Sequence, residues 1–303
     1  MTSGFSLVLT YLLVAVRRIL TVAWIRFNKF LTTPPAASKS LAKVAVIGDG
    51  YAEGLGDWVV MGAQAGPARF IDQLIRESSN VRTPWEIVNR GRAGTVSKDW
   101  CPPLPDDGKT EQQEQQKAGK GLWEKQARSK ACWDAEVFVL VLGTMDVAWE
   151  AVGMPMTAMA KTAMDDYAED ELCDTVKNIR RTCDALLAAG KSVVVCSVMT
   201  EGAMLTGKLG LAKRVNRQLQ LYVKGKVSDG AYKEKLELVK LHEPRIVRTQ
   251  NRAFDGLHLN NKGYKMFATV LFEKLEHMLT ASEWSRWKGK LEGSDEANKS
   301  KDA

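Results

Sequence analysis

Short apolar runs rich in valine and isoleucine recur along the chain, separated by longer amphipathic stretches. The runs predict five strands, at residues 43–48, 85–89, 136–142, 192–198 and about 237–241. The stretches between and after them predict helices at about 67–78, 122–133, 165–189, 208–225 and 261–280. Within residues 165–189 the apolar positions repeat about every 3.6 residues, and Gly190 follows in the C-cap position. Strands and helices therefore alternate through most of the chain.

This alternation predicts the fold class. Strands that are apolar throughout, joined by helices, are typical of a parallel sheet covered by helices on both faces. We predict a three-layer α/β/α, flavodoxin-like domain with a parallel sheet of about five strands, over residues 43–280. Residues 105–120 are polar and rich in glutamine, which predicts a solvent-exposed insertion between the second and third strands. Residues 281–303 are predicted to form a charged, frayed C-terminal tail.

The positive charge of the chain is concentrated at its N-terminus. The net charge is +7, yet residues 1–43 hold six Lys and Arg and no acidic residue. The remaining residues carry 37 basic against 36 acidic side chains. A nearly neutral body lacks the overall cationic charge of a nucleic-acid binder, so we predict no nucleic-acid partner.

The first 42 residues form a hydrophobic and basic segment followed by a linker. Residues 4–25 are mostly apolar, but Arg17 and Arg18 limit the uninterrupted run to 13 residues, and a membrane-spanning helix needs roughly 20. We predict a segment that contacts a membrane through residues 4–25 or that directs import into an organelle such as the mitochondrion. A signal anchor ending at Val16, with the two arginines as its cytoplasmic flank, remains an alternative.

The cysteines argue for a reducing compartment. Their number is odd and no two have CxxC spacing, so neither a disulfide framework nor a zinc site is indicated. We expect no metal and no cofactor. The five are Cys101, Cys132, Cys173, Cys183 and Cys196.

Four short motifs lie close behind predicted strands. They are Gly48-Asp49-Gly50, the segment Asn89–Gly94, the segment Gly143–Asp146 and the segment Asp255–His258. In a doubly wound sheet, ligands bind where the carboxyl ends of the strands open into loops. We therefore expect the four motifs to converge at one edge of the sheet.

In this order the motifs resemble the four blocks of the SGNH (GDSL-type) hydrolases, over residues 43–280. The resemblance implies that His258 is a general base and that Asp255 orients its imidazole. It also implies that the backbone N–H of Gly94 contributes to an oxyanion hole. A histidine with an unperturbed pKa of about 6.5 can accept a proton at neutral pH. His242 and His277 lack such a context, and we expect structural or surface roles for them.

Two residues of the family pattern are missing. Gly50 stands where the family has its serine nucleophile, and Met145 stands where an asparagine donates its amide to the oxyanion; Asp49, Thr144 and Asp146 flank these positions. Losing one oxyanion donor costs about 10²–10³ in turnover, and losing the nucleophile costs about 10⁶ in subtilisin. We therefore predict a catalytically impaired protein that binds an acyl, ester or lipid-like ligand or serves as a scaffold at a membrane.

Two alternatives stay open at this point. One is an active ester hydrolase in which Asp255 and His258 activate water in the space at Gly50, or a displaced hydroxyl; the hydroxyls nearby are Tyr51, Thr95, Ser97 and Thr144. The other is a dinucleotide site at Gly48-x-Gly50. Its third glycine comes one residue late for the GxGxxG pattern, and no acidic residue ends the second strand. A dinucleotide cofactor is therefore the minor alternative.

Overall fold

The structure is a computed structural model of the 303-residue chain. It describes residues 41–57, 64–103, 121–148, 172–200, 209–242, 246, 248–253 and 257–299, together with eleven positions between 9 and 27. The predicted insertion at 105–120 and the residue Asp255 lie outside this described part. The described positions between 9 and 27 are helical. No helix in the described part is both long and apolar enough to cross a membrane.

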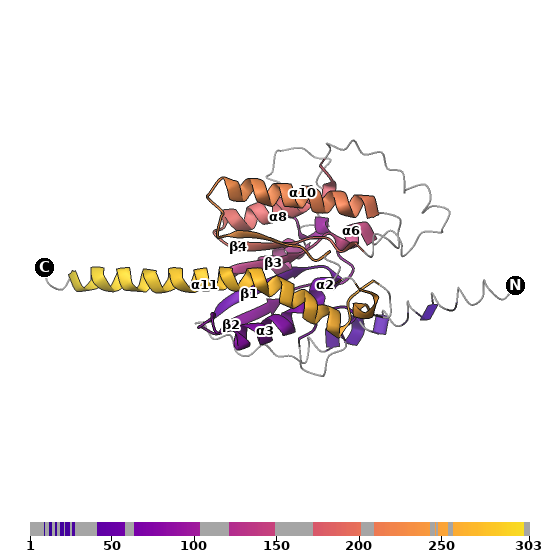
Figure 1. Cartoon of the computed structure of the whole chain (residues 1–303), viewed down its shortest axis with the longest axis horizontal. Helices are drawn as coiled ribbons and strands as arrows, with labels where there is room; N and C mark the ends of the chain where they lie inside the picture. The colour runs from indigo at the N-terminus through magenta and orange to yellow at the C-terminus, as the bar shows by residue number, and fades with distance from the viewer. Residues whose placement is uncertain are drawn as a thin grey trace.

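Five strands form one parallel sheet (Figure 1). Their order is β2-β1-β3-β4-β5, and all four pairings are parallel. This topology confirms the predicted five-stranded parallel sheet, with each strand within two residues of its predicted position. The strands are β1 (Ala42–Gly48), β2 (Trp85–Asn89), β3 (Val137–Val141), β4 (Ser192–Cys196) and β5 (Leu236–Val239).

Helices follow each strand, most of them close to their predicted positions. The α-helices are α2 (Gly50–Glu53), α3 (Pro67–Glu77), α5 (Lys130–Trp133), α6 (Thr144–Ala148), α8 (Asp174–Ala188), α10 (Leu209–Ser228) and α11 (Asn261–Lys299). Short helical turns of other types are η1 (Ser97–Trp100), η3 (Trp123–Ala127) and η5 (Thr249–Asn251). Gly190 follows α8 with a left-handed φ of 78°, as its predicted C-cap position requires.

Three helix predictions were wrong in their extent. The stretch 122–133 is not one helix, because the chain breaks at Ser129, whose hydroxyl donates to the Gln126 carbonyl before α5 begins. Helix α8 begins only at Asp174, because Cys173 is extended and its N–H is bonded to the Gln218 side chain. The expected frayed tail is also wrong, because α11 continues to Lys299 and projects past the sheet (Figure 1).

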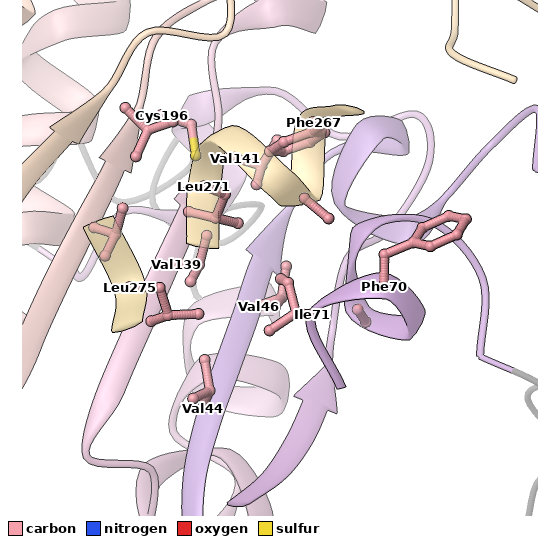
Figure 2. Close-up of a cluster of buried hydrophobic side chains, with 14 of the residues drawn as sticks. Val44, Val46, Phe70, Ile71, Val139, Val141, Cys196, Phe267, Leu271 and Leu275 are labelled. Atoms are coloured by element: carbon pink, nitrogen blue, oxygen red, sulfur yellow. The ribbon is translucent and has the colours of Figure 1, made fainter. Parts of the chain in front are cut away.

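Helices cover both faces of the sheet and bury its alternating side chains. Val44 and Val46 of β1 face α3 and α11. Figure 2 shows Phe267, Leu271 and Leu275 of α11 on the same side of the sheet as these two valines. The intervening residues of β1, Ala45 and Ile47, face the layer formed by α8 and α10. A strand whose neighbouring residues are buried on opposite faces must be apolar throughout, which explains the continuous valine and isoleucine runs. The three-layer arrangement confirms the predicted fold class.

A carboxylate fastens the projecting helix α11 to the start of β2. Glu283 accepts hydrogen bonds from the N–H of Arg82 (3.1 Å), the N–H of Thr83 (2.9 Å) and the indole N–H of Trp85 (3.0 Å). Burial acts to raise the pKa of Glu283, but these hydrogen bonds outweigh it and hold the pKa below its usual value. The stabilisation is therefore present above the ordinary glutamate pKa and is lost as the pH falls through the lowered value.

We expect Glu283→Ala to lower the free energy of unfolding by about 1–2 kcal/mol at neutral pH, because several charge-assisted hydrogen bonds vanish at a half-exposed site. Glu283→Gln keeps one acceptor oxygen and should lose less. Urea denaturation of the two variants and the wild type measures both effects. Equal stability of all three proteins would show that the contact contributes nothing.

Candidate functional site

Hydrogen bonds join the four motifs at the carboxyl edge of the sheet. The N–H of Asp49 donates to the Val141 carbonyl at 3.1 Å, and the N–H of Arg92 donates to the Gly48 carbonyl at 2.8 Å. The Tyr51 hydroxyl donates to the Leu257 carbonyl at 2.5 Å. The first motif and the residue after it, Tyr51, therefore bond to the segments that carry the other three motifs, as expected for loops at the carboxyl edge of one parallel sheet.

Gly50 and His258 lie against each other in the centre of this cluster. Gly50 begins α2 and is buried, and His258 is fully buried in the loop before α11. A Cβ atom placed on Gly50 would lie 2.7 Å from Nε2 of His258. The imidazole thus takes up space that any side chain at position 50 would need. The Tyr51 ring packs on the imidazole with 4.9 Å between ring centroids.

Asp49 caps α2 and is fully buried. One carboxylate oxygen accepts the N–H of Tyr51 at 3.0 Å, and the other accepts the N–H of Met145 at 3.3 Å. Burial raises the pKa of Asp49 to about 7, although both hydrogen bonds act to lower it. Asp49 thereby links the first and third motifs through backbone N–H groups.

Apolar side chains fill the place where the oxyanion donor of the family is expected. Met145 is 1% exposed and packs against Leu257 and the partly buried Val96. A thioether donates no hydrogen bond, and none of these three side chains supplies a polar group. This part of the site is a small apolar cluster rather than a polar anion pocket.

Comparisons with known proteins identify the fold. No protein-family model matches the chain, and no curated protein matches it in sequence. A solved structure of a family 3 carbohydrate esterase from Clostridium thermocellum matches with a TM-score of 0.50 and 16% identity, over 80% of this chain and 98% of that one. A GDSL-like lipase from Bacteroides thetaiotaomicron matches with a TM-score of 0.48 and 15% identity, over 84% of this chain and 98% of that one. The first of these matches and the order of the parallel strands show that the chain has the SGNH hydrolase fold. Likeness at these identities establishes the fold and leaves activity to be argued from the site.

The second motif approaches α2 through Gly91. Gly94, the predicted oxyanion donor, is exposed and has a left-handed φ of 81°. The close approach to α2 is made by Gly91, where an added Cβ would lie 2.2 Å from the N–H nitrogen of Glu53. Only glycine fits at position 91. The role of Gly94 in anion binding remains a prediction from the resemblance.

Two further residues of the third motif, Thr144 and Asp146, form hydrogen bonds with neighbouring loops. The Thr144 hydroxyl accepts the N–H of Met199 at 3.1 Å. Asp146 accepts hydrogen bonds from the N–H (2.9 Å) and the hydroxyl of Ser97. Burial raises the pKa of Asp146, while its hydrogen bonds act to lower it. Both side chains hold together the loops around the four motifs.

The hydroxyls near Gly50 are all engaged in structural hydrogen bonds. Tyr51 donates to the Leu257 carbonyl, and Thr95 donates to the Arg92 carbonyl at 2.8 Å. The Ser97 hydroxyl donates to Asp146, and Thr144 is bonded to Met199. A nucleophile must reach both a base and a substrate carbonyl. Each of these four oxygens therefore has a structural hydrogen-bond partner of its own.

Among the described residues, a serine and a histidine outside the four motifs also contact each other. Ser197 Oγ lies 2.8 Å from Nδ1 of His242, and the two residues follow β4 and β5 in the sequence. The same oxygen accepts the N–H of Leu241 at 2.8 Å, and Ser197 is 3% exposed. This contact ties together the ends of two strands, which agrees with the structural role expected for His242. In the described ranges, no three His, Cys, Asp or Glu side chains gather as metal ligands do.

Proposed function

We propose that this protein is a non-hydrolytic member of the SGNH fold that acts as a ligand-binding or scaffold protein at a membrane. Position 50 has no nucleophile to attack an ester carbonyl, and Met145 has no amide to donate a hydrogen bond to the oxyanion that the attack would form. The retained Asp255–His258 pair alone supplies a base and no atom to attack with.

The packing of His258 carries this proposal. Its Nε2 would be only 2.7 Å from a Cβ on Gly50, and its ring is fully buried. A catalytic base needs its proton acceptor within reach of a nucleophile in a site that a substrate can enter. The imidazole instead lies in the space that a side chain at position 50 would need, and its ring packs on Tyr51 of α2.

We expect the purified full chain to hydrolyse p-nitrophenyl acetate no faster than His258→Ala does. Neither the nucleophile nor the side-chain oxyanion donor is present. Losing them lowers turnover by about 10⁶ and 10²–10³, so removing His258 has little further rate to lower. Release of p-nitrophenolate, followed at neutral pH against a buffer blank, measures this.

The rival, an ester hydrolase that activates water through Asp255 and His258, gives the opposite result. Hydrolysis well above the blank that disappears in His258→Ala would overturn the proposal. His277→Ala is the matched control, because His277 lies exposed on α11. It must leave any measured rate unchanged.

The membrane role is proposed from the N-terminal segment. Apolar side chains on its helical positions are exposed, among them Leu12, Leu13, Ile19 and Leu20. An apolar helix face beside basic residues is typical of a helix that lies in a membrane interface. Val22, from the same segment, packs against Leu55 and Ala65 of the body.

We expect deletion of residues 1–33 to release the protein from phosphatidylcholine vesicles containing phosphatidylserine. The deletion removes the exposed apolar face and its arginines together. Flotation of the full and shortened chains with the same vesicles tests this. Equal flotation of the two would contradict membrane contact through this segment.

A further inference from the structure

A cavity of about 400 Å³ lies beside the loop that follows β2. Three arginines line it, with Arg26 coming from the N-terminal segment and Arg90 and Arg92 from the loop; Glu53 and Gln126 are also in its wall. Gly50, Met145 and His258 do not line it. The cavity is therefore formed at the second motif, which supplies four of its lining residues from Asn89 to Arg92, and not around the His258 imidazole.

We propose that this cavity binds the dianion of a phosphate monoester. Three guanidinium groups and the single carboxylate of Glu53 leave an excess of about two positive charges, and a phosphate monoester carries roughly −1.5 to −2 at pH 7. A carboxylate ligand would neutralise about half of this charge. Within the described residues, no ion pair joins Arg26, Arg90 or Arg92 to an acidic side chain.

The wall that carries two of the arginines is held rigidly. The Asn89 side chain donates to the Ala52 carbonyl at 2.9 Å and accepts the N–H of Gly91 at 2.9 Å. The backbone N–H groups of Arg90 and Arg92 each donate at 2.8 Å to carbonyls of β1. The backbone of Arg90 and Arg92 is therefore already ordered before an anion binds, and only their side chains lose freedom on binding.

The guanidinium group of Arg90 has a buried donor that lacks a hydrogen-bond acceptor within the described part of the chain. Its Nε is buried and has no hydrogen-bond partner among the described residues. A buried donor without an acceptor is costly, and a bound anion or water is a common resolution. The planar guanidinium fork matches the oxygens of phosphate, which can accept several N–H groups at once.

Two sources present this same dianion, a soluble phosphate ester and the headgroup of phosphatidic acid. Arg26 belongs to the segment whose exposed apolar side chains we propose to contact a membrane, and Phe27 beside it is also exposed. The proposal concerns the cavity itself and does not rest on the loss of hydrolysis. The test therefore begins without any membrane.

The first arm titrates inorganic phosphate into the full chain at constant ionic strength and follows the heat of binding. We expect saturable binding that weakens about 10- to 100-fold in Arg90→Gln/Arg92→Gln, because two charge-assisted contacts are lost. Arg92→Gln alone is the variant least able to disturb folding, because Arg92 is exposed, and it should weaken binding in the same direction. Arg217→Gln, exposed on α10, is the matched control and should bind as the wild type does.

The second arm compares flotation with phosphatidylcholine vesicles that contain phosphatidic acid or, at matched surface charge, phosphatidylglycerol. A preference for phosphatidic acid that Arg92→Gln abolishes identifies the lipid headgroup as the source. Saturable phosphate binding without that preference identifies a soluble ester. Absence of specific binding in both arms, or binding that the Arg92→Gln and double variants leave unchanged, overturns the proposal. Flotation that fails with every vesicle while phosphate still binds counts against membrane contact and leaves the cavity supported.

Discussion

Replacing Gly50 by serine is expected to destabilise the fold by about 1–3 kcal/mol and to leave ester hydrolysis at background. A Cβ at this position would lie 2.7 Å from Nε2 and 3.4 Å from Cδ2 of His258. The ring cannot move away freely, because it is fully buried and packs on the Tyr51 ring. A serine side chain gains roughly 0.5 kcal/mol over glycine in a helix, which is too little to offset the overlap.

A double-mutant cycle isolates the contact between these two residues. We expect Gly50→Ala to cost stability in the wild type and to be nearly neutral in His258→Ala, giving a coupling energy of about 1–3 kcal/mol. Gly225→Ala is the matched control, because an added Cβ on this α10 glycine meets no atom within 4 Å. It should be neutral or slightly stabilising. Urea denaturation of the set provides the free energies.

Activity separates the two explanations of the missing serine. If the imidazole were poised as a base, Gly50→Ser would regain measurable hydrolysis of p-nitrophenyl acetate without losing stability, and that result would refute the packed-core interpretation. We expect no such gain even in Gly50→Ser/Met145→Asn. Met145 lies in an apolar cluster with Leu257, and an amide placed there has no hydrogen-bond partner in that cluster.

The sequence was sufficient to predict the sheet and the meeting of the four motifs. The strands are buried on both faces, so their residues are apolar at every position, and this signal survives without an alignment. Helix ends were predicted less well. The start of α8 depends on a hydrogen bond from Cys173 to Gln218, which comes from a distant helix and leaves no local signal.

The closure of the site could not be predicted from the motifs. The residues Gly50 and Met145 indicate which chemical groups are lost, but the sequence does not indicate which side chains fill their places. That depends on contacts between residues more than 100 positions apart, such as Met145 with Leu257 and Tyr51 with His258. The arginine cavity was missed because Arg26 lies far along the chain from Arg90 and Arg92 and joins them only when the chain folds.

The free energy of unfolding is expected to fall as the pH rises from about 4 to 7 because of Asp49. In the unfolded chain this carboxyl ionises near its ordinary pKa of 3.8, whereas burial raises its pKa to about 7 in the folded protein. Between these values the folded state binds one more proton, so stability decreases with pH, by on the order of 4 kcal/mol in total. Above about pH 7 both states are ionised and the loss stops growing.

Asp49→Asn separates this contribution from those of other carboxylates. Burial also raises the pKa of Asp57 and Asp146, which adds slopes of the same sign, while the lowered pKa of Glu283 gives the opposite slope. Asparagine does not titrate, and its NH₂ group must face one of the two N–H donors, at a pH-independent cost of about 1–3 kcal/mol. The variant should therefore be less stable than the wild type near pH 5 and approach or exceed it near pH 8.

Urea denaturation of wild type, Asp49→Asn and Asp134→Asn at pH 5, 6, 7 and 8 measures these slopes. Asp134 is exposed, so its replacement serves as the control for removing one carboxylate. Parallel pH profiles for the wild type and Asp49→Asn would mean that Asp49 is already ionised in the folded protein. In that case the two backbone hydrogen bonds from Tyr51 and Met145 would outweigh burial at the N-terminus of α2. A converging profile instead identifies Asp49 as a neutral, buried cap that holds the first and third motifs together.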